Sequence, residues 1–343
     1  MNLSESRTVS TKRIRHVPRT LVIGGAGFIG SHVVEALLAQ GHAVRVLDNL
    51  STGNLHNLPL NHPDLELKIG SILDYETVQN AMFGMRNCVM LAAQVSAALS
   101  VELPYESATS NILGFINVLQ SARALRLYRL VYASSAAVYG DCSNLPLEET
   151  EAVRPINPYG LEKHVDELYA DLYSRQYDLN TLGLRFFNVY GPRQDPSSLY
   201  SGVISKFLQK LSANRSPQIF GDGKQTRDYI HVSDVAQACL KALQSDYRGV
   251  CNVATEKRID LLRMVKILGE AVGTTVEPEF SSQRVGDIRH SCGSAARLRD
   301  VLQYSASVSL EQGLTELADD YQRQRTSAAA GARKHTIELK RKH

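Results

Sequence analysis

The sequence predicts an α/β fold, in which a doubly wound parallel sheet carries a smaller, interleaved C-terminal domain. Apolar runs alternate with stretches of helical periodicity as far as Asn188, which is typical of a parallel sheet covered by helices on both faces. Beyond Asn188, glycine, proline and polar turns become frequent and predict shorter elements. The length of 343 residues and the hydrophobic content of 43% allow a sizeable core.

The runs place the expected elements in chain order. We expect strands near 20–24, 42–47, 65–69, 88–92, 129–134 and 181–187, and helices near 28–40, 75–83, 105–126 and 159–176. Elements near 228–232 and 249–254 are expected to return to the sheet. In such a Rossmann-type fold the ligand binds at the carboxyl ends of the strands.

The same features predict how the chain is divided. We expect a basic tail at 1–19, a Rossmann domain at 20–187 with returning elements near 228–255, a substrate-facing domain at 188–227 and 256–325, and a basic tail at 326–343. Both tails are rich in Lys, Arg and His with little apolar periodicity, so they are expected to be solvated and disordered.

Composition narrows the class of protein. No run approaches a membrane span and the N-terminus lacks an apolar signal segment, so we expect a cytoplasmic protein with no membrane partner. The net charge is only +3 and no nucleic-acid-binding motif accompanies the basic tails, so no nucleic-acid partner is expected. The five scattered cysteines form no C-x-x-C pair, which predicts free, mostly buried thiols and neither disulfides nor a metal site.

A glycine-rich turn follows the first expected strand. Gly24, Gly27 and Gly30 stand in the spacing G-x-x-G-x-x-G, and Asp48 ends the second strand. Glycines permit a tight turn and a close approach of a pyrophosphate to the helix N-terminus. A carboxylate at Asp48 can accept hydrogen bonds from a ribose, and no arginine directly follows it to bind a 2′-phosphate. The stretch therefore predicts an NAD site rather than an NADP site.

A second group of residues can carry proton chemistry. Tyr159 and Lys163 are four residues apart on an expected helix and therefore share a face, so the ammonium can stabilise the phenolate. Ser135 stands at the end of the expected strand that precedes them. These positions predict Tyr159 as the proton carrier, Lys163 as its electrostatic partner and Ser135 as the hydroxyl that orients the substrate oxygen.

Together these motifs resemble the extended short-chain dehydrogenase/reductase superfamily, and within it the NAD-dependent sugar-nucleotide epimerases. The resemblance covers about residues 20–325. It includes DNLSTG (48–53), LAAQVS (91–96), NILGFINVLQSAR (111–123), RFFNVYGPRQ (185–194), GDGKQTRDYIHVSDVA (221–236) and VGDIRHS (285–291).

The resemblance implies a 4-epimerase of UDP-hexoses or UDP-N-acetylhexosamines with bound NAD. Tyr159 would take the proton of the sugar 4-hydroxyl while C4 is oxidised, the 4-ketose would turn over, and reduction would follow on the opposite face. A homodimer is implied, through helices near 105–126 and 159–176. The implied cofactor-binding residues are Gly24, Gly27, Phe28, Ile29, Gly30, Asp48, Asn49, Ser51, Thr52, Gly53, Ser71, Ile72, Leu91, Ala92, Ala93, Asn111, Tyr159, Lys163 and Phe186.

The resemblance also implies a set of substrate contacts. They are Ser96, Ser135, Ala136, Asn188, Val203, Arg227, Asp287, Arg289 and Ser291. Arg227 and Arg289 are candidates for the UDP pyrophosphate because a guanidinium fork suits it, and Asp287 for the uridine ribose. A surface ion pair between Arg227 and Asp228 is the alternative.

Ser291 bears on the choice of sugar. In epimerases of this type the residue four past the Asp of the G-D pair, here Asp287, lines the sugar pocket, and a small residue there leaves room for an N-acetyl group. UDP-N-acetylglucosamine and UDP-N-acetylgalactosamine are therefore expected as substrates, and UDP-glucose and UDP-galactose are kept as further candidates. The alternative is that Ser291 is a small loop residue and that another side chain, such as Leu99, closes the pocket.

Other functions stay open at this point. A sugar-nucleotide dehydratase or decarboxylase shares the fold, but such relatives carry an acid just after the strand serine, where this chain has Ala136-Ala137-Val138. A UDP-glucuronate epimerase is a further alternative. A non-enzymatic NAD-sensing regulator would typically lack the pair of Tyr159 and Lys163. A structural or RNA-associated role would depend on the basic tails.

Overall fold

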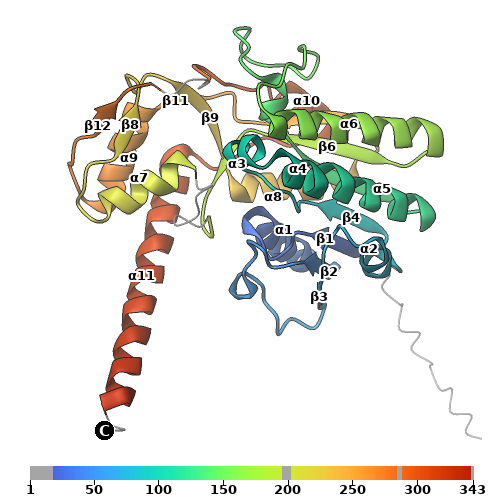
Figure 1. The fold of residues 1–343 in the computed structure, drawn as a ribbon, viewed down its shortest axis with the longest axis horizontal. Helices are drawn as coiled ribbons and strands as arrows, with labels where there is room; N and C mark the ends of the chain where they lie inside the picture. The colour runs from blue at the N-terminus through green and yellow to red at the C-terminus, as the bar shows by residue number, and fades with distance from the viewer. Residues whose placement is uncertain (1–17, 195–201, 284–287, 341–343) are drawn as a thin grey trace, which may run out of the picture.

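The computed structural model describes residues 18–194, 202–283 and 288–340 (Figure 1). Its main element is a seven-stranded sheet in the order β10-β6-β5-β4-β1-β2-β3, in which every pairing is parallel. The strands are β1 (Arg19–Ile23), β2 (Ala43–Asp48), β3 (Leu65–Ile69), β4 (Asn87–Met90), β5 (Arg129–Ser135), β6 (Thr181–Phe186) and β10 (Gly249–Val253). The predicted Rossmann-type sheet is therefore confirmed, including the returning strand near 249–254.

Helices cover both faces of this sheet. One face carries α1 (Phe28–Ala39), α8 (Val232–Gln244) and α10 (Ala296–Leu302), and the other carries α2 (Tyr75–Met82), α5 (Gly114–Ala124) and α6 (Pro158–Tyr177). Alternate strand residues enter the two cores: Val22 faces α1 and α8, whereas Leu21 and Ile23 face α2 and α5. Burial on both faces explains why these strands are continuous apolar runs.

A smaller layer lies beside the carboxyl ends of the main strands (Figure 1). It contains β7 (Asn188–Tyr190), β9 (Thr226–His231) and β11 (Arg258–Asp260) in one sheet, β8 (Gln218–Phe220) and β12 (Glu279–Ser281) in another, and the helices α7 (Val203–Leu211) and α9 (Leu261–Val272). The segment 228–232 was expected to rejoin the main sheet, and this prediction is wrong. Its strand, β9, pairs with β7 and β11 instead.

The helix expected near 105–126 is interrupted. The chain forms α3 (Ala97–Glu102), α4 (Pro104–Ala108), the π-helical turn η2 (Thr109–Leu113) and then α5. At this turn the side chain of Asn111 points inward and bonds to Gln94 and Glu162. Wider π turns of this kind are typical where a side chain is drawn out of the regular helix pattern. Short 3-10 turns, η1 (Leu55–Asn57) and η3 (Ala136–Tyr139), complete the described elements.

The C-terminal segment also differs from its prediction. Residues 326–343 were expected to be disordered, but α11 (Leu310–Lys340) continues through them as far as Lys340. Alanine, arginine and lysine recur along 328–340, and their high helix propensity favours extension of the helix. Figure 1 shows the end of α11 projecting away from the body of the molecule. The N-terminal tail lies almost entirely outside the described residues.

Cysteines, metal-ligating groups and long apolar helices were considered in the sequence, and the described residues show where each stands. All five cysteines are free, and four of them are buried, as predicted. Across 18–194, 202–283 and 288–340, no group of three or more His, Cys, Asp or Glu side chains is placed to hold a metal ion. None of the helices in that part of the chain combines the length and apolar character that crossing a membrane requires.

Candidate active site

A cavity of about 760 Å³ lies between the main sheet and the smaller layer. One wall is formed at the carboxyl ends of β1, β2, β4, β5 and β6, and the other by β7, β8, β9 and the start of α7. Its volume falls within the range of pockets that bury small ligands and cofactors. The predicted location at the strand ends of a doubly wound sheet therefore coincides with a cavity of suitable size.

The glycine-rich turn forms the floor of this cavity between β1 and α1. Gly24 has a φ of +81°, and a Cβ added there would lie 2.6 Å from the amide nitrogen of Ala92. A Cβ at Gly30 would lie only 2.0 Å from the carbonyl oxygen of Gly24. The turn thus depends on glycine at both positions, and it brings the N-terminus of α1 to the cavity wall, where its amides favour an anion.

Asp48 ends β2 beside this turn and is held in place by the backbone. Its Oδ2 accepts a hydrogen bond from the amide of Ala26 at 2.9 Å, and its Oδ1 accepts one from the amide of Leu50 at 2.8 Å. A carboxylate can accept further hydrogen bonds beyond these two, and Asp48 lines the cavity. The turn and the carboxylate together fit the pyrophosphate and ribose of a dinucleotide.

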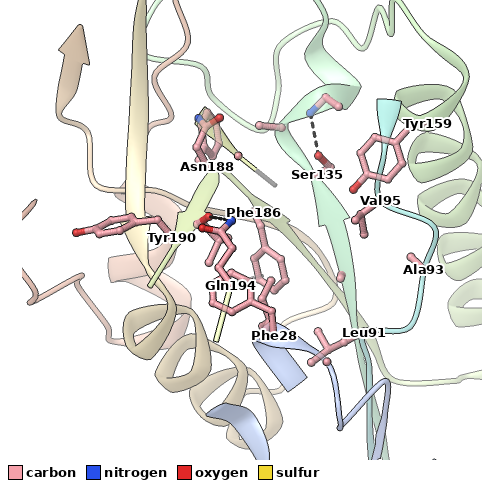
Figure 2. A pocket seen from close by; sticks show the side chains of 18 of the residues that line it. Phe28, Leu91, Ala93, Val95, Ser135, Tyr159, Phe186, Asn188, Tyr190 and Gln194 are labelled. Carbon is pink, nitrogen blue, oxygen red and sulfur yellow. Dashed lines mark hydrogen bonds between the residues drawn. The ribbon is translucent and has the colours of Figure 1, made fainter. Parts of the chain in front are cut away.

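Most of the predicted cofactor-binding residues line the cavity. They are Gly24, Gly27, Phe28, Ile29, Gly30, Asp48, Asn49, Ser51, Thr52, Leu91, Ala92, Ala93, Tyr159, Lys163 and Phe186. Figure 2 shows Phe28, Leu91 and Phe186 on the same side of the cavity. These apolar side chains can pack against the flat rings of a bound dinucleotide.

Three further predicted cofactor-binding residues, Gly53, Ser71 and Ile72, are not among the described lining residues. Gly53 packs behind the carboxylate of Asp48, because a Cβ there would lie 2.8 Å from Oδ1. The hydroxyl of Ser71 accepts a bond from the amide of Leu73 and closes a local turn. Ile72 is buried in the core of α2 and α5.

Asn111, also predicted to bind the cofactor, forms hydrogen bonds within the protein. Its amide group donates to the carbonyl oxygen of Gln94 and to Glu162 Oε2, and its oxygen accepts from the amide of Gln94. Glu162 Oε2 also accepts from the hydroxyl of Ser107. Asn111 is buried and lies outside the described cavity lining. It joins the loop after β4 to α6, directly before Lys163.

The three predicted catalytic residues meet at one wall of the cavity. Ser135 is the last residue of β5, and its hydroxyl accepts a hydrogen bond from the amide of Ala137 at 3.1 Å. Tyr159 and Lys163 lie in the first turns of α6, and both line the cavity. Figure 2 shows Ser135 and Tyr159 together at this wall, with the phenol turned into the cavity.

Local sequence explains why α6 begins here. Asn157 caps the helix by accepting a bond from the amide of Gly160 at 2.9 Å, and Pro158 occupies the first helical position. The amide of Tyr159 donates to the hydroxyl of Ser100 at 3.0 Å, which ties the helix start to α3. Two hydrogen bonds, one from Gly160 to Asn157 and one from Tyr159 to Ser100, therefore hold the first turn of α6, which carries the phenol.

Lys163 is buried in an ion pair. Its ammonium nitrogen lies 3.1 Å from Asp166 Oδ2, three residues further along α6. Burial works against the charged ammonium, but the carboxylate of Asp166 and the phenol of Tyr159 outweigh it and raise the pKa of Lys163. The residue is thus kept as a cation beside the phenol.

The opposite wall carries the predicted substrate residues. Asn188, Val203, Arg227 and Ser291 all line the cavity, while Ser135 and Ala136 line it from the first wall. Asn188 donates to the carbonyl oxygen of Asp228 at 2.9 Å. The alternative of a surface ion pair with Arg227 is not supported, because Asp228 is fully buried and accepts bonds from Thr255, Glu256 and Gly293.

Two predicted substrate-binding residues, Arg289 and Ser96, lie outside the described cavity lining. The guanidinium of Arg289 pairs with both carboxylate oxygens of Asp222 at 2.7 and 2.8 Å. Ser96 instead caps α3, where its hydroxyl accepts from the amide of Leu99. Asp287 lies outside the described residues.

Further lining residues were not anticipated from the sequence. They include Val95, Phe187, Val189, Tyr190, Gln194, Gln218, Phe220, Gln225, Tyr229, Leu261 and Ile288. Tyr229 could have been found from Arg227, because residues two apart on a strand share a face. Phe187, Val189 and Tyr190 adjoin Asn188 in the chain. Residues such as Gln218, Leu261 and Ile288 come from separate segments, which only the tertiary structure brings together.

Known proteins resemble this chain over most of its length. Residues 20–254 match the model of the NAD dependent epimerase/dehydratase family. A putative UDP-glucose 4-epimerase from Methanocaldococcus jannaschii is 40% identical over 270 residues, which cover 78% of this chain and 87% of that protein.

Solved structures agree with this similarity. A UDP-N-acetylglucosamine 4-epimerase from Methanobrevibacter ruminantium, in complex with UDP-N-acetylmuramic acid, is 34% identical with a TM-score of 0.87, over 90% of this chain and 99% of that one. A UDP-glucose 4-epimerase from Thermus thermophilus, in complex with NAD, is 35% identical with a TM-score of 0.83, over 89% and 99% of the two chains.

Proposed function

The chain belongs to the NAD dependent epimerase/dehydratase family, and from this premise we propose that it is a UDP-sugar 4-epimerase that accepts N-acetylated hexoses. The observation that carries the proposal is the group formed by Ser135, Tyr159 and Lys163 at the wall of a cavity that also contains the glycine-rich turn. This group can move a proton to and from a sugar hydroxyl beside a bound dinucleotide.

NAD is the cofactor of this family, and the residues present fit it. Gly24, Gly30 and the N-terminus of α1 would hold the pyrophosphate, and Asp48 would accept from the adenosine ribose. Lys163 would hold the nicotinamide ribose through its ammonium. When bound, NAD supplies the oxidation and reduction of the sugar C4 carbon.

The chain's own residues carry out the proton transfers. The Tyr159 phenolate takes the proton of the sugar 4-hydroxyl and later returns it, and the Lys163 ammonium stabilises the phenolate. The Ser135 hydroxyl orients the sugar oxygen toward the phenol. Between the two transfers the 4-ketose must turn over within the cavity.

The charges in the cavity favour epimerisation over dehydration or decarboxylation. Asp48, at the end of β2, supplies the one carboxylate among the described lining residues. Directly after Ser135 the wall is formed by Ala136 and Ala137. An acid for proton transfer next to a 4-ketone is therefore missing from that part of the described wall, as the sequence suggested.

The preference for N-acetylated sugars is proposed from Ser291. This small side chain lines the cavity, and its amide donates to the carbonyl oxygen of Thr226 at 3.1 Å, which fixes its backbone beside β9. Leu99, the side chain named as an alternative closure, is outside the described lining. Both observations support a pocket with space beside the sugar.

A substrate panel tests the proposed function. The purified protein should interconvert UDP-N-acetylglucosamine and UDP-N-acetylgalactosamine without added NAD, because the cofactor is regenerated within each turnover and should copurify. Chromatographic separation of the epimers measures this, with UDP-glucose, UDP-galactose and the uronic acids run in parallel. Failure to turn over either N-acetylated sugar would refute the substrate assignment, and failure with every UDP-sugar would refute the epimerase.

We also propose a homodimer formed by the helices α4 to α6. Several large apolar side chains are exposed on this side, namely Tyr105 (79%), Leu113 (54%), Leu161 (52%) and Leu168 (55%). Leu161 and Leu168 are seven residues apart and share a face of α6. Exposed apolar patches of this kind are typical of association surfaces, and pairing with a second copy would bury them.

Charge on this face should prevent dimerisation. The double variant Leu161→Glu/Leu168→Glu is expected to elute as a monomer, with its mass measured by light scattering, because two buried carboxylates would face two more across the symmetric interface. Phe280→Glu, at an exposed position on β12, is the matched control and should remain dimeric. A parent protein that is itself monomeric would contradict the proposal.

A further inference from the structure

The buried partner of Lys163 has no part in the proton transfers described above. Asp166 Oδ2 lies 3.1 Å from the ammonium nitrogen, and the side chains of Asp166 and Lys163 are only 2% and 6% exposed. Resting on the proposed function, we propose that Asp166 is a positioning residue that keeps the Lys163 ammonium charged and directed toward the phenol of Tyr159.

The geometry gives Asp166 a defined task. A lysine ammonium is a compact charge with three donors on a flexible stem, so one fixed acceptor restricts where the other donors point. Lys163 lines the cavity, and Asp166 fixes it from the protein side. A buried ion pair is by itself weak evidence for stability, because desolvation offsets much of the attraction. The ion pair is therefore better explained by its effect on the position of the Lys163 ammonium than by a contribution to stability.

The neighbouring carboxylates on α6, Glu162 and Glu167, bind side chains other than Lys163. Glu167 forms a bidentate ion pair with Arg185, in which both N–O distances are 2.8 Å, and it also accepts a hydrogen bond from the hydroxyl of Ser134. Glu162 Oε2 accepts from Ser107 and Asn111. Asp166 is thus the carboxylate that contacts the ammonium. The other titratable or charged groups around the pair are Tyr159, Glu162, His164 and Glu167 on α6, Tyr132 on β5 and Arg185 on β6.

The electrostatics give the direction of the effect. Burial raises the pKa of Asp166 to about 6, although Lys163 opposes this, so the carboxylate is ionised at pH 7.5 or above. Burial alone would lower the pKa of Lys163, and Asp166 is the largest influence that raises it. Without the carboxylate the pKa of Lys163 falls, and the ammonium loses its proton at a lower pH.

The variant Asp166→Asn tests this in the enzyme. The alkaline limb of its kcat profile should move to lower pH by at least about one unit, so that at any pH on that descending limb kcat is about tenfold below the parent value. KM should change less than kcat, because the sugar is not contacted. Asp166→Glu, which keeps the charge, should restore most of the profile. Asp171→Asn makes the same change at an exposed position of α6 and should leave the profile as in the parent.

A second measurement is independent of turnover. The pH dependence of Lys163 acylation by acetic anhydride, followed by peptide mass spectrometry on NAD-free protein, reports the neutral amine directly. Its midpoint should fall by at least about one unit in Asp166→Asn and not in Asp171→Asn. An unchanged midpoint would overturn the proposal even if the protein is an epimerase, and a shifted midpoint would support it even if it is not.

Loss of folding is the remaining outcome to consider. Asp166→Ala is the second variant, because its smaller side chain admits water beside the ammonium. If thermal unfolding shows that neither Asp166→Asn nor Asp166→Ala folds, Asp166 has a structural role and the proposal is wrong. The same conclusion follows if either variant lowers kcat without moving the alkaline limb.

Discussion

Tyr159→Phe is expected to lower kcat by at least about a hundredfold on every UDP-sugar that the parent protein epimerises. The hydroxyl that this change removes lines the cavity beside Ser135, and losing a general acid-base group commonly costs a factor of a hundred to ten thousand. The ring is kept, so packing at the start of α6 should be preserved. Steady-state assays measure the loss, and NAD released on denaturation shows that the cofactor is still held.

The matched control is Tyr169→Phe on the same helix. Tyr169 packs against the core beside α2 and α5 and is outside the described cavity lining, so its variant should retain turnover within about threefold. Near-parental activity in Tyr159→Phe would mean that another group carries the proton. Equal losses in both variants would point to a disturbed helix instead.

Ser291→Tyr is expected to separate the two classes of substrate. A tyrosine at this cavity-lining position would fill the space proposed for the N-acetyl group, and overfilling a packed site costs about 1–3 kcal/mol or more. At about 1.4 kcal/mol per factor of ten, kcat/KM on the N-acetylated pair should fall by about fivefold to a hundredfold or beyond. UDP-glucose and UDP-galactose should be turned over within about threefold of the parent.

Ser291→Ala controls for the lost hydroxyl, since it keeps the small volume and should keep both activities. If Ser291→Tyr loses plain and N-acetylated sugars equally, the residue does not discriminate at the sugar 2-position. Parental activity on both classes would place the pocket elsewhere. Either outcome would leave the assignment of Tyr159 and Lys163 intact.

Local patterns in the sequence were enough for the main sheet. The seven strands of the sheet are near the predicted positions, because burial on both faces requires continuous apolar runs that are visible in the chain itself. Helix α6 could be predicted from Asn157, Pro158 and the periodicity that follows. The interruption at 109–113 could not, because it depends on partners of Asn111 that are 17 and 51 residues away.

The same division holds for the candidate site. Spacing alone placed Tyr159 and Lys163 on one face of a helix, because the two residues are only four apart. It also placed the glycine-rich turn and Asp48 at strand ends, which lie together in a parallel sheet. Tertiary structure decided what each polar side chain meets at longer range. It paired Arg289 with Asp222 and turned Asn111 toward Glu162. The sequence by itself therefore determined the fold class and the residues suited to the chemistry. Packing between distant segments determined which of those residues reach the cavity, because a side chain's partners depend on every element that surrounds it.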